Sequence, residues 1–128
     1  MGHQLWPPEG APFLEPEEVV ARLQREFPAA SADQEAGAAS LDEGIGYMRG
    51  WKGVPAAAEM IAKAERDRGR AWEMVLADTA KPGRVYLTTL VRPEEGLLFG
   101  YTDARHERAA APLLPRAARA LGYELHLV

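Results

Sequence analysis

The hydrophobic pattern of this 128-residue sequence changes its period near residue 71, and this change limits the fold more than any other feature. Beyond that point, apolar residues alternate with other side chains or run almost continuously, as they do in β-strands. The segments with this pattern are residues 71–80, 84–92 and 96–102. The sequences KPGR and PEEG separate them, and proline and glycine favour tight turns there. We therefore predict three consecutive antiparallel strands, with a fourth strand at residues 123–128.

Two segments before this point show the helical period. Residues 16–27 begin with proline and two glutamates, which suit the start of a helix, and carry one apolar face. Residues 55–68 begin at Pro55 and are followed by Gly69, which is typical of a helix end. We expect a helix in each segment.

A third helix is predicted at residues 103–121, with Thr102 or Asp103 as its cap and Gly122 as its end. Pro112 and Pro115 fall inside it. Proline removes a backbone hydrogen bond and clashes with the preceding turn, so it must kink this helix or split it. The sequence leaves that choice open.

The remaining segments lack a clear period. Residues 1–14 are expected to form an extended arm, tethered by Trp6, Phe13 and Leu14. Residues 29–43 are expected to be a loop, or to contain a short element that the pattern does not reveal. The predicted order is α-loop-α-β-β-β-α-β in one domain, residues 1–128. This order indicates an α+β two-layer sandwich, with three helices packed on a mainly antiparallel four-stranded sheet.

Composition excludes several classes of function. The chain has no cysteine, so it has no disulfide, thiol nucleophile or cysteine-bound metal. Its net charge of −4 argues against nucleic-acid binding. We find no signal-peptide pattern and no apolar run long enough for a membrane span, so we expect a cytoplasmic protein with no membrane association. Asparagine is absent and arginine far outnumbers lysine, which suggests a thermophilic bacterial source.

The sequence GIGYMRGWKGVP, residues 44–55, has an unusual density of glycine. It fits neither the dinucleotide-binding nor the P-loop glycine pattern. We interpret it first as scaffold, either a strand with one bulky and one bare face or a loop anchored by its aromatic residues. The second interpretation is an anion site formed by Arg49, Lys52 and Gly53 ahead of the next helix.

The last predicted helix carries two candidate sites. An uninterrupted helix would align four arginines in a basic stripe, but we favour their interpretation as an ordinary solvated face. His106 lies on the apolar face, where a histidine is more often packed in the core than a ligand. It could instead act with Asp103 in acid–base chemistry. A metal site could also combine it with Asp103, Glu107 and His126. No standard metal-binding spacing is present, so we predict no metal and no cofactor. The four arginines are Arg105, Arg108, Arg116 and Arg119.

Three functions remain open. The leading one is a binding or protein-interaction module, rather than an enzyme, that forms a homodimer through its sheet or an edge strand. This expectation follows because three helices cannot cover both faces of the sheet. The second is a protein or enzyme that binds a small molecule or anion between residues 44–54 and the start of the last helix. Its polar groups would be Arg49, Lys52, Gly53, Arg105 and His106. The third is an acidic inhibitor or immunity-like partner protein.

Overall fold

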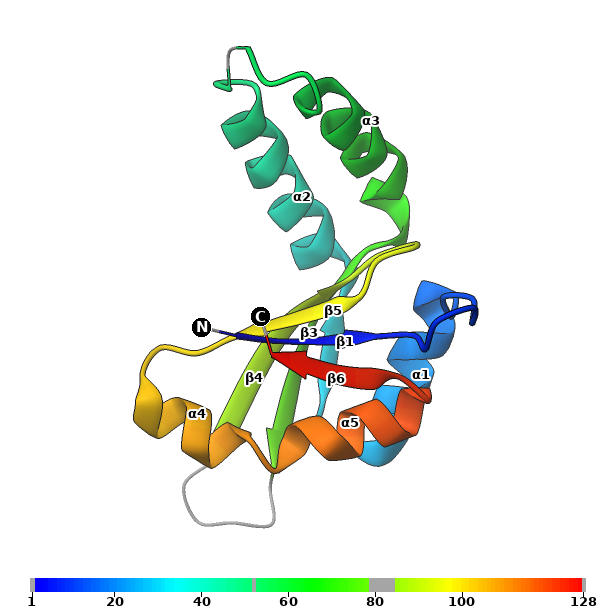
Figure 1. The fold of residues 1–128 in the computed structure, drawn as a ribbon, viewed down its shortest axis with the longest axis vertical. Coiled ribbons are helices and arrows are strands. Elements are labelled where there is room, and N and C mark those ends of the chain that lie inside the picture. Colours follow the sequence, from blue (N-terminus) through cyan, green and yellow to red (C-terminus); the bar gives the residue numbers. More distant parts are fainter. Residues whose placement is uncertain (1, 52, 79–84, 128) are drawn as a thin grey trace.

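The computed structural model describes residues 2–51, 53–78 and 85–127 (Figure 1). Its strands are β1 (Gly2–Trp6), β2 (Ser31–Asp33), β3 (Trp72–Asp78), β4 (Val85–Val91), β5 (Leu97–Gly100) and β6 (Glu124–Leu127). Its helices are α1 (Pro16–Glu26), α2 (Gln34–Met48), α3 (Ala57–Asp67), α4 (Ala104–Ala110) and α5 (Leu113–Leu121), with a short 3-10 helix, η1 (Arg68–Arg70). The α+β class is confirmed. The predicted numbers of helices and sheets are wrong in detail.

The strands form two antiparallel sheets, in the orders β2-β3-β4 and β5-β1-β6. The hairpin of β3 and β4 is confirmed, and Leu76 lies opposite Leu87 in its register. The predicted meander fails at β5, which pairs with β1 instead of forming a ladder with β4. The Thr89 hydroxyl donates to the carbonyl oxygen of Leu98 at 3.0 Å and so joins the two sheets. The turn predicted at residues 81–84 lies outside the described residues.

The N-terminal segment is not the predicted arm. Residues 2–6 form the middle strand of the β5-β1-β6 sheet. Leu5 is fully buried in this strand and lies between Leu97 and Leu125 in the register. Of the predicted tethers, Leu14 packs against the main core, whereas the rings of Trp6 and Phe13 meet each other edge to face at 4.9 Å. A five-residue strand with one buried apolar side chain is too short to show a period.

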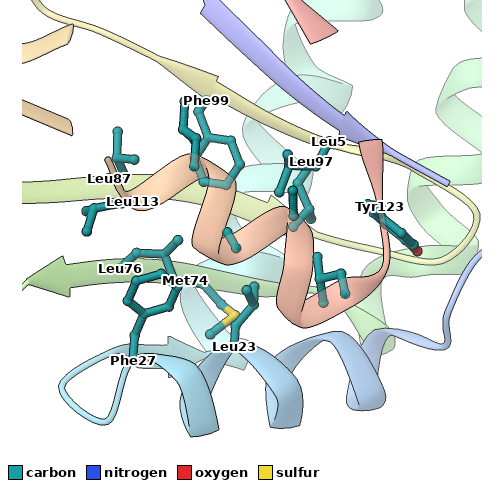
Figure 2. Packing of buried hydrophobic residues seen from close by; sticks show 14 of the residues in the cluster. Leu5, Leu23, Phe27, Met74, Leu76, Leu87, Leu97, Phe99, Leu113 and Tyr123 are labelled. Carbon is teal, nitrogen blue, oxygen red and sulfur yellow. The ribbon is translucent and has the colours of Figure 1, made fainter. Parts of the chain in front are cut away.

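Helices α1 and α5 cover one face of the sheets and form the main core with them (Figures 1 and 2). Leu23 of α1 and Phe27 at its C-terminal cap are directed toward the sheets, and Leu113 of α5 lies beside Leu87 of β4 (Figure 2). The α1 prediction is confirmed because Pro16 begins this helix and Val19, Leu23 and Phe27 are buried on its apolar side. Burial of large side chains such as these contributes about 1.5–3 kcal/mol each.

Pro112 splits the last predicted helix into α4 and α5. Asp103 caps α4 by accepting a hydrogen bond from the backbone N–H of His106. Pro115 is tolerated because it lies in the first turn of α5, where the backbone N–H has no partner within the helix. Gly122 ends α5 in the left-handed conformation, with φ of 69°, as predicted.

Residues 29–43 are not a loop. They form β2 and most of α2, and α2 continues to Met48. The favoured interpretation of residues 44–55 is therefore wrong for its first half, which is helical. The Asp33 carboxylate caps α2 by accepting from the N–H of Ala36 at 2.9 Å. The buried side of the helix is formed by Gly37, Leu41 and Ile45, so its apolar face is narrow and includes a glycine.

Helices α2 and α3 form a hairpin that projects away from the two sheets (Figure 1). The prediction for α3 is confirmed within two residues at each end. A separate small core holds the hairpin to the start of β3 and contains Leu41, Ile45, Ala64 and Ala71. The hairpin tip extends far beyond this core, and Tyr47 near the tip is 74% exposed.

Candidate functional site

A groove of about 540 Å³ lies between the α2–α3 hairpin and the face of the sheets that α1 and α5 leave uncovered. Ser40 of α2 and Met60 of α3 line one side of the groove. Gln4 of β1 and Leu98 of β5 line the other. Glu73 of β3 and Leu90 of β4 also line it.

The alternation of side chains along the strands determines which residues project to this uncovered face. Directly opposed residues of antiparallel strands project to the same side, and neighbours along a strand project to opposite sides. Leu87 and Val91 are buried on the core side of β4. Thr88 and Leu90 are their immediate neighbours along the strand and therefore project to the uncovered face. Glu73 lies opposite Leu90 in the register, and therefore shares that face.

A buried ion network sets the position of the hairpin beside this face. Asp67, only 5% exposed, accepts from the Lys63 ammonium at 2.6 Å and from Arg92 Nε at 2.9 Å. Lys63 also donates to the carbonyl oxygen of Pro93 at 2.7 Å and lies 3.4 Å from the Glu95 carboxylate. A buried charge requires such partners, because an unpaired charge is costly to remove from water. The network therefore ties the end of α3 to the segment between β4 and β5.

Glu73 is different from the other acidic groups near the groove. It is half-buried, yet within the described part of the chain it forms no hydrogen bond or ion pair. Arg92, which follows β4, lines the same groove, but its Nε donates to Asp67. Leu98 is 58% exposed and Met60 is 46% exposed in the same groove. Glu95 also lines the groove, but its carboxylate lies 3.4 Å from the Lys63 ammonium. Among the described residues of the groove, Glu73 therefore offers a carboxylate without an ion-pair partner, beside accessible apolar side chains.

The residues predicted to share an anion or small-molecule site are not brought together. Arg49 lies at the end of α2, where its guanidinium is 3.5 Å from the Glu65 carboxylate. Gly53 lies in the tip of the hairpin with φ of 76°, and Lys52 is outside the described residues. Arg105 and His106 belong to α4, at the far end of the molecule from that tip (Figure 1). The two halves of this hypothesis lie on separate surfaces.

Both nitrogens of the His106 ring are engaged by the backbone. The N–H of Thr102 donates to Nδ1 at 3.2 Å, and Nε2 lies 2.8 Å from the carbonyl oxygen of Tyr86. The ring must therefore carry its proton on Nε2 and donate it to Tyr86. The Asp103 carboxylate accepts from the backbone of His106 at 2.7 Å, not from its ring. This arrangement fastens α4 to β4.

Aromatic side chains next to His106 extend its contact between α4 and the sheets. The ring of Tyr101 meets the rings of His3 and His106 edge to face, and its hydroxyl lies 2.8 Å from His3 Nδ1. Burial raises the pKa of Tyr101, with a smaller contribution from the charge of Glu107. The contact between Tyr101 and His3 therefore holds the end of β5 against β1.

The predicted basic stripe is divided between two helices. Arg116 of α5 pairs with Glu26 at 3.0 Å, and its guanidinium lies 4.6 Å from the centre of the Phe27 ring. Arg105 lies on α4, beyond the break at Pro112. His126 lies on β6 with its Nε2 3.6 Å from Glu124, rather than with His106. Among the described residues, no three histidine or acidic side chains are arranged to hold a metal ion.

Comparison with known proteins returns no relative. No protein-family model matches the sequence, and no curated protein or solved structure is significantly similar to it. In the ranges 2–51, 53–78 and 85–127, no helix combines the length and apolar character needed to cross a bilayer.

The groove residues were missed as a site by sequence reasoning, although part of their signal was present. Leu90 and Leu98 gave their strands a second apolar face, which indicated an uncovered side of the sheet. Met60 and Ser40 gave no signal, because their place depends on how the hairpin meets the sheets.

Proposed function

We propose that the protein is a binding module that takes a polypeptide segment of a partner protein into the groove beside the α2–α3 hairpin. The observation that carries this proposal is the half-buried Glu73 carboxylate, which has no partner among the described residues and lies in a groove with Met60 and Leu98. A carboxylate in this position lowers its energy by accepting from a cationic donor.

The chemistry of the groove favours one kind of segment. A lysine or arginine side chain can donate to Glu73, while apolar residues beside it cover Met60 and Leu98. The hydroxyl groups of Ser40 and Thr88 supply hydrogen-bonding partners for a backbone. Groups of this kind fix the orientation of a ligand, and apolar contact supplies most of its affinity.

The test is selection of peptides from a random 12-residue library, followed by fluorescence-polarisation titration of the selected peptides. We expect selected peptides to contain a basic residue flanked by apolar residues. Glu73→Lys and Leu98→Asp should each weaken binding by at least about tenfold, which corresponds to 1.4 kcal/mol. Glu9→Lys makes the same charge change at an exposed position outside the groove and should bind as the wild type does. Equal binding by Glu73→Lys and the wild type would contradict the proposal.

A further inference from the structure

Strand β6 presents an open edge of the β5-β1-β6 sheet. Among the described strands it pairs with β1 alone, and it is the last strand in the sheet order (Figure 1). All four of its residues are exposed, and Leu127 is 69% exposed. An edge of this kind carries unpaired backbone N–H and carbonyl groups that can pair with another strand.

The two faces of β6 differ in chemistry. Leu125 lies opposite Leu5 and Leu127 opposite His3, so the two leucines project to the side of the main core. Glu124 and His126 project to the other side. The carboxylate of Glu124 and the imidazole of His126 therefore lie two positions apart on one face of β6. Leu125, between them in the sequence, is exposed on the other face.

We infer that two copies of the chain pair antiparallel through β6, about a two-fold axis at Leu125. In this register Leu125 faces Leu125 of the partner subunit. Glu124 faces His126 of the partner subunit, and His126 faces the partner subunit's Glu124. The interface is isologous, so both complementary pairs form at once.

The register follows from the chemistry of the strand. Directly opposed residues in an antiparallel pair share a face. An axis between two consecutive residues would oppose side chains from different faces. The two-fold axis must therefore pass between two copies of the same residue. An axis at His126 would place two imidazoles opposite each other and leave Glu124 with no complementary side chain opposite it in the partner subunit. The axis at Leu125 places a carboxylate against an imidazole N–H donor twice and leucine against leucine once, and opposed complementary pairs stabilise a sheet.

This interface is separate from the groove. Strand β1 lies between β6 and β5, and neither Leu125 nor His126 lines the groove. The dimer therefore has two grooves available to partners, and its existence does not depend on what the grooves bind.

Charge exchange tests the interface. We expect sedimentation equilibrium of the wild type to show a concentration-dependent dimer. Glu124→Lys and His126→Glu should each raise the dissociation constant at least about tenfold, because each makes a like-charged or unpaired contact twice. The double variant E124H/H126E restores both pairs in the Leu125 register and should dimerise as the wild type does. A monomeric wild type, or a double variant as dissociated as the single variants, would overturn the inference.

Crosslinking tests the same register without altering the charges. The chain has no cysteine, so L125C introduces a single thiol that can reach only its own copy in the partner subunit. Directly opposed Cβ atoms lie about 4.5–5.5 Å apart, whereas diagonal positions lie about 7–8 Å apart. Under mild oxidation, L125C should form covalent dimers at least about tenfold faster than H126C. The opposite order would place the axis at His126 and overturn the inference, and far-UV circular dichroism confirms that each variant is folded.

Discussion

Gly37 of α2 lies against the carbonyl group of Ala71, so closely that a β-carbon at residue 37 would overlap that oxygen atom and the backbone of Trp72. The helix can rest on the start of β3 only because residue 37 has no side chain. We expect Gly37→Ala to lower the free energy of unfolding by about 1–3 kcal/mol, the usual cost of forcing atoms into a packed contact. Urea denaturation followed by circular dichroism measures it. An unchanged unfolding midpoint would mean that α2 does not approach β3 as described.

Gly44 and Gly46 of the same helix are the matched comparison. A β-carbon at either position meets no atom within 4 Å. Glycine inside a helix costs about 0.5–1 kcal/mol relative to alanine, because it loses more backbone freedom on folding. Gly44→Ala and Gly46→Ala should therefore each raise the free energy of unfolding by about that amount in the same denaturation experiment. Destabilisation by both would show that these residues are not helical.

Asp67 should be among the most sensitive polar residues of the chain. Asp67→Asn removes the charge that Lys63 and Arg92 share in a buried site. We expect a loss of about 2–3 kcal/mol in the free energy of unfolding, because two cations lose their common partner. Glu65→Gln removes the exposed partner of Arg49 and should change stability by less than about 0.5 kcal/mol. Equal effects of the two variants would argue against a structural role for the network.

Stability should fall in acid because of two arginine-paired carboxylates. Hydrogen bonds from Arg70 lower the pKa of Glu17, and those from Arg68 lower the pKa of Asp42. A carboxyl group whose pKa is lower in the folded state favours folding above its unfolded pKa, and this contribution is lost as pH falls through the folded value. The loss should therefore begin as pH falls below about 4.5 for Glu17 and 3.8 for Asp42.

NMR titration of the two carboxyl groups checks the pKa directions, and urea denaturation between pH 7 and pH 3 checks the effect on stability. Arg68→Gln should return the pKa of Asp42 toward its ordinary value and leave that of Glu17 lowered. A pKa of Asp42 that does not respond to this substitution would show that Arg68 is not its partner in solution.

Local sequence patterns predicted the elements that make their main contacts through one regular face. Val19, Leu23 and Phe27 repeat at four-residue intervals, so α1 was found with its correct start at Pro16. The strands β3 and β4 were found because both carry continuous apolar or alternating residues and pair with each other. The end of α5 was predicted correctly because glycine, here Gly122, readily adopts the left-handed conformation that ends a helix.

The missed elements depend on contacts that no local pattern records. Helix α2 packs through Gly37 and a narrow face, and its clearest signal was the cap at Asp33. Strand β1 is defined by partners about a hundred residues away in the sequence, since His3 pairs with Phe99 and Leu127. The groove was unpredictable for the same reason, because the position of Met60 depends on the ion network at Asp67.

The pairing of β1 with β6 determines when folding can finish. His3 pairs with Leu127, so the middle strand of this sheet is synthesised first and its edge strand last. A nascent chain must keep Leu5 exposed until residues 97–100 and 124–127 have both left the ribosome. Closing so long a loop is entropically costly and slows folding. This sheet can therefore be completed only after β6 has been synthesised, and Leu5 and Phe99 remain available to chaperones until then.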